Sequence, residues 1–400
     1  MWMDSDTGFH EAATAYRPGP SADNADRLAR LRLIRSRRVG PATFRRMMAE
    51  HGGAEAALAA LPEVAKQAGV EGYEVCSEAA ALAEVKAARR LGARMLGLGD
   101  PGYPADLANC ADAPPILWAL GDTRLLARPM LAMVGTRNAS SLGSRMARKL
   151  AADLAEAGFV IVSGLARGID ALAHHAALAK GTIAVQAGGL DVIYPAENTD
   201  LAHDIAKQGL RLSEQPFGLD PQARHFPQRN RIVSGLARAV IVVEAAARSG
   251  SLITARNALD QGREVLAVPG HPMDTRASGC NRLLRDGATL VRNAEDVIEA
   301  IGPTEQPTRQ QRLPLAEIPE LPKQPERDWR DRAALNSRIL SQLGPAPVAE
   351  DQLLRDLGMS PFEAAAVLSR MELEGAVQRQ PGGLISLATA QQSGSGKKSP

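Results

Sequence analysis

The chain is poor in aromatic side chains, with three tryptophans, four tyrosines and six phenylalanines among 400 residues. So few rings exclude a binding surface made mainly of stacked aromatics. Its three cysteines, Cys76, Cys110 and Cys280, lack the paired spacing of a zinc knuckle or a disulfide framework. The histidines show no metal-ligand spacing either, since His174 and His175 are neighbours on one predicted helix. We therefore expect buried thiols, structural histidines and no metal site.

Long apolar runs are also absent. No stretch approaches the roughly 20 apolar residues that span a bilayer. The first residues carry Asp4 and Asp6 without the apolar segment of a secretory signal. Hydrophobic residues make up 45% of the chain and charged residues 23%, which is the balance of a soluble globular protein. We expect a cytoplasmic protein of two or three domains with no membrane partner.

Common cofactor and nucleophile signatures are missing. The segment GTRNASSLG offers Gly135 and then no glycine until Gly143, so it does not match the G-x-G-x-x-G dinucleotide fingerprint. The chain contains neither a P-loop lysine motif nor a G-x-S-x-G nucleophile turn. NAD and ATP are disfavoured as ligands, and we expect no cofactor.

Lysine is rare and arginine is common, 8 against 39, although the formal net charge is only +2. Guanidinium suits phosphate because its planar fork donates two hydrogen bonds at once. Biased codon usage is the alternative explanation, since the chain is also rich in alanine and glycine. The number of arginines cannot distinguish binding of a polyanion from biased codon usage. Only the positions of the arginines in the chain can do so.

Residues 1–24 are predicted to form a disordered leader, and residues 25–96 a small helical domain. Eight arginines and no acidic residue lie between Arg27 and Arg46. Apolar residues recur there at helical spacing, and Val39, Gly40 and Pro41 interrupt them, which predicts a helix, a tight turn and a second helix. The turn amides could bind a phosphate, as in helix-hairpin-helix modules. The alternative is a helical domain with a solvated arginine face.

The Pro-rich segment from Gly97 to Asp122 is expected to be an extended connector.

Residues 97–302 are predicted to form the central domain. Its short apolar runs, MLAMV, FVIV, TIAVQ, LRLS, AVIVVE, EVLAV and TLV, alternate with helical patterns. Near-continuous apolar strands separated by helices indicate a parallel sheet covered on both faces. The fold class is therefore α/β, with an extended Rossmann-like doubly wound sheet.

Residues 303–332 contain six prolines and many charges and are expected to be a linker. Residues 333–388 show three helical patterns, which include Ile339, Leu353 and Met371, followed by a Gly-turned hairpin. Three helices and a wing predict a winged-helix domain. Residues 389–400 are expected to be a disordered tail.

Small residues and arginines follow the strands of the central domain. Ligands bind open α/β sheets at the carboxyl ends of the strands, and glycine lets the backbone approach an anion, above all where a helix begins. A binding rim is therefore predicted from the loops that contain Arg137, Ser163, Gly164, Arg167, Gly168, Gly188, Gly189, Ser249, Gly250 and Ser251.

A second basic segment lies between Pro221 and Arg238 and contains no acidic residue. Several guanidinium forks can follow a sugar-phosphate backbone while one ring stacks on a base. The predicted contacts are Arg224, Phe226, Arg229, Asn230 and Arg231. In the alternative interpretation Phe226 belongs to the core and the arginines form a solvated face.

Four carboxylates near strand ends, Asp170, Asp191, Glu214 and Glu244, are positioned where catalytic acids or bases could work. Buried carboxylates that accept hydrogen bonds from loop amides are at least as common at such positions. The composition and spacing leave this choice open.

Eight motifs together resemble the DprA (Smf) family of DNA-processing proteins. They are GTR at 135, SGLARGID at 163, GGLDVIYP at 188, SE at 213, FPQRNRIVSGL at 226, VVEAAARSGSLITA at 242, QGREVLAVPG at 261 and GCNRLLRDGA at 279. The resemblance implies a sterile-alpha-motif-like helical domain, a Rossmann-like domain and a winged-helix domain. It also implies non-sequence-specific binding of single-stranded DNA, a homodimer formed through the Rossmann-like domain, and loading of the recombinase RecA during natural transformation.

By the same resemblance, the DNA-binding residues include Arg137, Ser163, Gly164, Arg167, Gly168, Phe226, Arg229, Asn230 and Arg231. Relatives often have a lysine shortly before the phenylalanine, and Arg224 is the candidate substitute here. The third C-terminal helix departs from a DNA-reading helix, because Arg370 stands against Glu363, Glu372 and Glu374. That domain is expected to contact protein or only to pack.

Two other functions remain open. Phosphoribohydrolases of the lysine-decarboxylase-like fold have a similar middle domain and would make the chain a nucleotide-processing enzyme. Their P-G-G-x-G-T-x-x-E signature is absent, since Glu244 precedes Ser249 here. A regulator that binds duplex DNA through the winged helix is disfavoured by the acidic helix. A non-enzymatic protein is the expectation.

Overall fold

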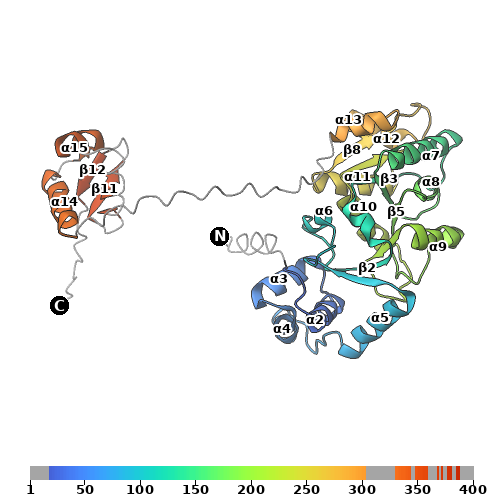
Figure 1. Ribbon diagram of the computed structural model, residues 1–400, viewed down its shortest axis with the longest axis horizontal. Helices are drawn as coiled ribbons and strands as arrows, with labels where there is room; N and C mark the ends of the chain where they lie inside the picture. Colours follow the sequence, from blue (N-terminus) through green and yellow to red (C-terminus); the bar gives the residue numbers. More distant parts are fainter. Residues whose placement is uncertain are drawn as a thin grey trace, which may run out of the picture. The chain divides into compact units, whose positions relative to one another are not determined.

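The computed structural model describes residues 18–302, 329–343, 347–358, 367–368, 371–372, 376–380 and 384–387. The chain divides into two compact units, residues 1–306 and 307–400, and each is described by itself (Figure 1). Most of the predicted leader, linker and tail lies outside the described residues. Nothing in the structure tests the predicted domain boundaries.

Four helices begin the first unit. They are α2 Asn24–Arg35, α3 Pro41–His51, α4 Ala54–Gln67 and α5 Glu78–Leu91. Asp23 caps α2 by accepting a hydrogen bond from the amide of Asp26, and Pro41 opens α3, where its missing N–H costs nothing. The predicted pair of helices is confirmed, with the break at residues 36–40 and Pro41 as the first residue of the second helix. Leu33, Phe44 and Met47 are buried between the helices.

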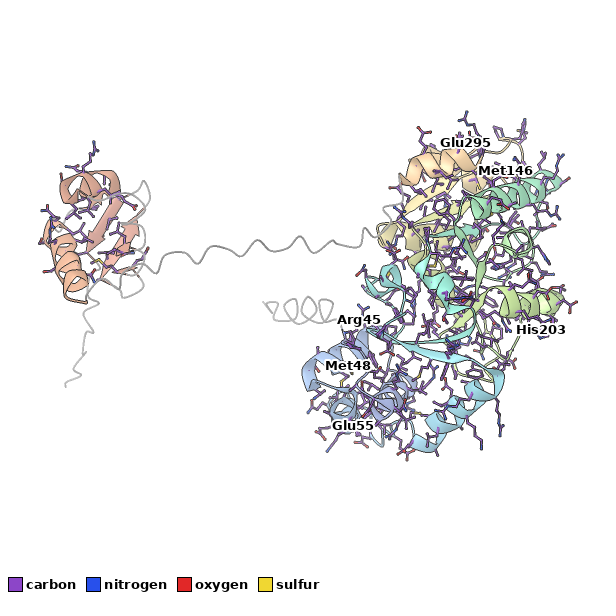
Figure 2. All side chains as sticks on the ribbon, in the orientation of Figure 1. Arg45, Met48, Glu55, Met146, His203 and Glu295 are labelled. Carbon is purple, nitrogen blue, oxygen red and sulfur yellow. The ribbon has the colours of Figure 1, made fainter. Side chains whose placement is uncertain are left out.

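The predicted solvated arginine face is wrong for part of this block, because several of its arginines are buried or paired. Arg30 is 6% exposed, and its Nη1 donates to the carbonyl of Leu98 at 3.2 Å. Arg45, labelled in Figure 2, belongs to α3. It is 5% exposed and donates to the carbonyl of Cys110 at 2.7 Å. Arg35 pairs with Glu84 at 2.7 Å. These side chains fasten the helices to the sheet and are not free to bind a phosphate.

A nine-stranded sheet forms the centre of the first unit, in the order β1-β2-β6-β5-β4-β3-β7-β8-β9. The strands are β1 Arg94–Gly97, β2 Ile116–Gly121, β3 Met130–Val134, β4 Val160–Ser163, β5 Thr182–Val185, β6 Leu210–Ser213, β7 Ala239–Val242, β8 Glu264–Ala267 and β9 Thr289–Leu290. All seven strands predicted from apolar runs are present, and β3 to β9 pair in parallel. The strand order reverses at β3, which lies between β4 and β7.

The predicted extended connector is wrong, because this region contributes two strands, β1 and β2, to the sheet. β1 and β2 pair antiparallel, and β2 pairs antiparallel with β6. The apolar run at Ile116–Ala119 is buried, with Trp118 only 2% exposed. A run buried on both faces favours a strand, whereas the prolines before it only shape the loop that contains α6 Ala105–Ala108.

Helices cover both faces of the sheet, as predicted for a doubly wound fold (Figure 1). Buried residues of α10 His225–Leu236, α11 Ser251–Asp260 and α12 Ser278–Arg285 form one hydrophobic cluster with the strands. Those of α7 Ser141–Glu156, α8 Ile169–Ala177 and α13 Ala294–Ile301 form another. A third, smaller cluster contains the buried residues of α9 Thr199–Gln208. The carboxyl ends of the strands stay open between these layers.

The second unit has the elements of a winged helix. They are α14 Trp329–Gln342, β10 Val348–Ala349, α15 Glu350–Leu357, β11 Val377–Gln380 and β12 Leu384–Leu387. Its three strands pair antiparallel in the order β10-β12-β11. Ile339, Leu353 and Met371 are buried in its core. Of the acidic third helix only residues 367–368 and 371–372 are described, so its predicted role is untested.

His174 makes the stability of the first unit depend on pH. It is fully buried on α8, and its Nδ1 lies 2.7 Å from the hydroxyl of Thr182. Burial lowers the pKa of His174 from 6.5 to about 3. The unfolded chain therefore binds a proton that the folded chain does not, and stability falls as the pH drops below about 6.5.

We expect His174→Asn to remove this dependence while keeping a donor to Thr182. From pH 7 to pH 5 the wild type should lose about 2 kcal/mol of unfolding free energy more than the variant does. Urea denaturation at the two pH values measures this, with His175→Asn, an exposed neighbour, as the control. Equal losses in His174→Asn and the wild type would contradict the expectation.

Candidate nucleic-acid interface

The carboxyl ends of β3, β4 and β7 open onto a groove of about 670 Å³, here called the rim groove. Its walls are the loops after these strands and the first turns of α10 and α11. This is where the strand order reverses, the position at which open α/β sheets bind ligands. The structure brings eight of the predicted site residues to its lining: Arg137, Gly164, Phe226, Arg229, Asn230, Ser249, Gly250 and Ser251.

Two exposed arginines line the rim groove from the ends of two neighbouring strands. Arg137 follows β3, and its guanidinium lies 5.5 Å from the centre of the Phe226 ring. Arg248 follows β7 and also lines the groove. Neither forms an ion pair with any residue in the described part of the chain. Both guanidinium groups are therefore available to an anionic ligand. The small net charge of the whole chain does not reveal this local concentration of positive charge.

The first turn of α11 also lines the rim groove. Gly250 precedes the helix, and the hydroxyls of Ser249 and Ser251 lie 2.7 Å apart. The amides of Ser251, Leu252 and Ile253 already donate to acceptors within the turn, so the helix dipole is what favours an anion at this end. Because Gly250 has nothing within 4 Å of where a Cβ would be, a ligand can approach its backbone closely. The predicted serine and glycine cluster is thus part of the groove.

Asp170 fixes the loop that follows β4. Its Oδ2 accepts hydrogen bonds from the amides of Gly164 at 3.0 Å and Ala166 at 3.4 Å. Asp170 is 6% exposed, and burial raises its pKa although the loop amides and Arg229 oppose that shift. The sequence left open whether Asp170 is a catalytic group or a buried acceptor for loop amides. The structure shows a buried acceptor for loop amides.

Arg229 lies beneath the groove and is 6% exposed. Its Nη1 donates to the carbonyl of Gly164 and, at 2.6 Å, to that of Val185. Burial lowers the pKa of Arg229 to about 10, and Asp170 counteracts part of that shift, so the side chain is charged near neutral pH. A Cβ on Gly164 would collide with this guanidinium, which explains the glycine. Arg229 joins the ends of β4 and β5.

Four predicted contact residues do not line the rim groove, and their contact with a ligand stays a prediction. Ser163 has no exposed surface, and its hydroxyl donates to the carbonyl of Met133 at 2.6 Å. Gly188 and Gly189 are buried beside the segment 216–221. Arg231 pairs with Glu214 at 2.5 Å and with Asp112 at 3.7 Å. Each is committed to the protein interior by a partner far away in the sequence.

The remaining predicted residues lie at the margin of the rim groove. Arg167 is exposed, 3.5 Å from the carboxylate of Glu197, and lines a small hollow beside Phe226. Gly168 precedes α8 at φ 75°, a conformation that favours glycine, and lies against Thr136. Arg224 precedes α10 and is exposed, with its Nε donating to His225 at 3.2 Å.

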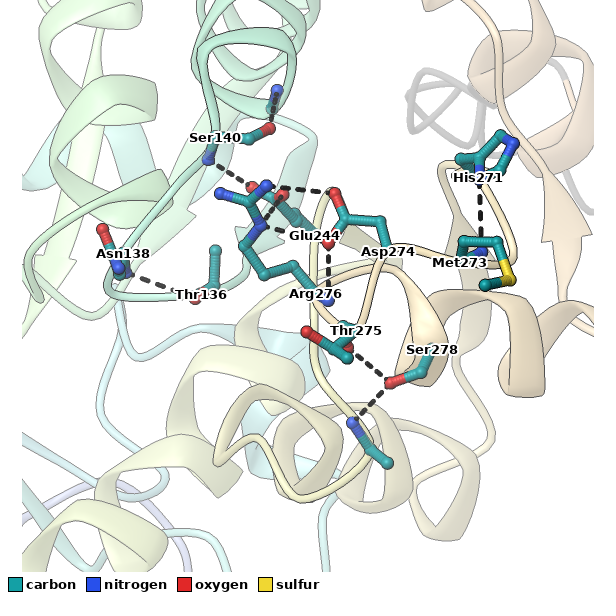
Figure 3. A network of polar contacts seen from close by, with 12 residues as sticks. Thr136, Asn138, Ser140, Glu244, His271, Met273, Asp274, Thr275, Arg276 and Ser278 are labelled. Carbon is teal, nitrogen blue, oxygen red and sulfur yellow. Dashed lines mark hydrogen bonds and ion pairs between the residues drawn. The ribbon is translucent and has the colours of Figure 1, made fainter.

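Glu214 and Glu244, proposed from sequence as possible catalytic carboxylates, also hold the fold together. Glu244 accepts a hydrogen bond from the amide of Ser140 at 2.9 Å, at the start of α7 (Figure 3). Its other oxygen lies 3.7 Å from Nε of Arg276. Burial raises the pKa of Glu214, and its partner Arg231 opposes the shift. Asp191 likewise accepts from the amide of Gly218 at 2.9 Å.

The contacts predicted from the sequence do not include two residues of this region. Arg248 directly precedes the serine and glycine cluster, and its position after a strand was the signal available. Tyr194 lies with its ring centre 5.6 Å from that of Phe226, tilted by 55°, and its side chain is half exposed. The motif GGLDVIYP contains Tyr194, but no spacing rule connects it with Phe226, 32 positions along the chain.

The described parts of the chain contain no group of three His, Cys, Asp or Glu side chains that could hold a metal ion. No helix within those same ranges is long and apolar enough to cross a membrane. The three cysteines are free. Cys110 and Cys280 are buried as predicted, whereas the prediction is wrong for Cys76, which is only half-buried.

Known protein families match nearly all of the described residues. Residues 94–302 match the family of DNA recombination-mediator protein A. Residues 24–87 match a DprA-like N-terminal HHH domain, and residues 322–383 match a DprA winged helix domain. These matches confirm the family resemblance and the three kinds of fold predicted from the sequence.

Individual proteins agree with the family matches. The DNA processing protein DprA of Bacillus subtilis is 46% identical over 216 residues, which cover 53% of this chain and 73% of that protein. The protein Smf of Synechocystis is 38% identical over 309 residues, covering 71% of this chain and 77% of that one. The X-ray structure of DNA processing protein A from Streptococcus pneumoniae superimposes with a TM-score of 0.52 at 40% identity, covering 59% of this chain and 85% of that chain.

Proposed function

Because this chain belongs to the family of DNA recombination-mediator protein A, we propose that it binds single-stranded DNA in the rim groove without altering it chemically. The observation that carries the proposal is the convergence of Arg137, Arg248 and the first turn of α11 on one groove. Sugar-phosphate backbone offers an anion to each of these groups, whatever the base sequence. Binding is therefore expected to be non-sequence-specific.

Phosphate contacts are expected to provide most of the affinity, because the groove holds few aromatic rings and two exposed arginines without an ion pair among the described residues. Arg167 and Arg224 lie at its margin and would extend the contact along the strand. Arg229 and Gly164 would act from below, by shaping the loop after β4. Asn230 lines the groove, with its amide 3.5 Å from the carbonyl of Gly250, and would position that turn.

The wider role is proposed from the family. A recombination mediator would protect single strands and help load RecA during natural transformation, in the cytoplasm. We also propose a homodimer formed through the Rossmann-like domain. The domain boundaries 25–96, 97–302 and 333–388, with the linker 303–332, are kept as part of the same proposal.

A fluorescence-anisotropy titration with labelled oligonucleotides tests the binding proposal. We expect saturable binding of a single strand, with an affinity that falls steeply as salt rises, and clearly weaker binding of a duplex of the same length. Similar affinity for the duplex and the single strand would contradict the proposal, as would binding that does not respond to salt.

An enzyme acting on nucleotides is the competing function, and the geometry argues against it. Glu244 is engaged with the start of α7, and Asp170 is engaged with the loop amides, so neither is free in the groove to activate water. Incubation with nucleoside monophosphates is expected to release no free base. Release of base would favour the phosphoribohydrolase function.

A further inference from the structure

Three planar groups stand in a row beside the rim groove. The guanidinium of Arg137 lies 5.5 Å from the centre of the Phe226 ring. The ring of Tyr194 lies next to Phe226, with centres 5.6 Å apart and planes tilted by 55°. Together with Arg167 and Pro195 these residues enclose a small hollow. Arg137 comes from the end of β3, Phe226 from the first turn of α10 and Tyr194 from the loop before α9.

Phe226 is not an open platform for a base. It is partly buried, a cation lies over its ring, and a second ring packs against it. A base that stacked directly on Phe226 would have to displace one of these neighbours. Each contact stabilises the present arrangement, since a cation over a ring and a tilted pair of rings are both favourable.

Tyr194 is the part of this row that is open to a ligand. Its side chain is 50% exposed although it is a large ring, and Phe226 supports it from one side. Its hydroxyl has no hydrogen-bond partner within the described ranges. A half-exposed ring with a supported orientation loses little conformational freedom on binding, which favours it as a contact surface.

We infer that Tyr194 stacks on one base of the bound single strand, with Phe226 acting as its support. The inference rests on the proposed function. It assigns one contact to a base, whereas the other contacts proposed for the groove are to phosphate. The base stacks on the exposed ring of Tyr194, and the guanidinium groups of Arg137 and Arg167 lie close enough to the same hollow to meet the adjoining phosphates. Stacking of this kind tolerates any base, because every base has a π face.

Comparison of a dT oligonucleotide with an abasic oligonucleotide of the same length separates base contacts from backbone contacts. For Tyr194→Leu we expect affinity for the dT strand to fall roughly 5- to 20-fold and affinity for the abasic strand to stay unchanged. Tyr194→Phe should bind both strands as the wild type does, because the hydroxyl is not required. Tyr73→Leu, which removes a ring of the helical domain outside the groove, is the matched control.

A second variant keeps the inference testable if Tyr194→Leu does not fold. Tyr194→Trp is expected to show tryptophan fluorescence that the dT strand quenches more strongly than the abasic strand does. Equal binding of dT by the wild type and Tyr194→Leu would overturn the inference and leave the proposed function standing. An equal loss on both strands would also overturn it, because the ring would then act on the backbone or the fold. Failure of the wild type to bind any single strand would overturn both.

Discussion

Replacing Arg137 with alanine is expected to weaken binding of single-stranded DNA by roughly 10-fold or more at low salt. A hydrogen bond to a charged group contributes about 1.5 to 3 kcal/mol, and each 1.4 kcal/mol is a factor of ten in affinity. Arg137 is exposed, forms no ion pair with a described residue and lies beside both the groove and the Phe226 ring. Its loss therefore removes one phosphate contact and frees one face of the ring.

The salt dependence identifies the contact as electrostatic. For a single strand, each phosphate neutralised contributes about 0.7 to the slope of log affinity against log salt, so Arg137→Ala should lower that slope by about this amount. Arg137→Lys keeps the charge and should restore the slope but only part of the affinity, because a lysine lacks the planar fork. Arg148→Ala, an exposed arginine of α7 outside the groove, is the matched control. An unchanged slope in Arg137→Ala would show that this side chain does not bind phosphate.

The sheet was predictable because its strands are short apolar runs between helical patterns. All seven runs from Met130 to Val291 became strands or their immediate flanks, since a strand buried on both faces must be apolar throughout. The antiparallel addition of β1 and β2 was not predictable from the same signal. Prolines and glycines surround β2, and only its pairing with β6 shows that Ile116–Ala119 belongs to the core.

The position of the groove was predictable from topology, since carboxyl ends of parallel strands meet at one edge of a sheet. The role of each charge at that edge was not. Arg231 and Arg137 were both predicted to contact the ligand, yet Arg231 pairs with Glu214, whereas Arg137 forms no ion pair with a described residue. The same holds for Arg45, whose acceptor is the carbonyl of Cys110, 65 positions away. A count of local charges cannot reveal partners that only the tertiary fold supplies.

Replacing Arg229 with methionine is expected to give the largest loss of stability in the central domain, about 3 kcal/mol. Nη1 of Arg229 is a donor to both the Gly164 and the Val185 carbonyls, and a buried acceptor left without a partner costs about 1 to 3 kcal/mol. Asp170 would also lose the cation that lowers its pKa, and its charged form would become less favourable. Urea denaturation at neutral pH measures the loss. Arg224→Met, an exposed arginine just before the same helix, should change stability by less than about 0.5 kcal/mol.

The effect of Arg229→Met on DNA binding distinguishes support from contact. Because the loop 164–168 depends on Arg229 through Gly164, the variant should bind a single strand more weakly even where it is fully folded. Its salt slope should nevertheless match that of the wild type, since Nη1 of Arg229 is committed to the two carbonyls and the residue is 6% exposed. A slope lowered as in Arg137→Ala would mean that Arg229 turns outward to bind phosphate. An unchanged unfolding free energy would mean that it does not hold β4 and β5 together, so the two measurements test the two roles separately.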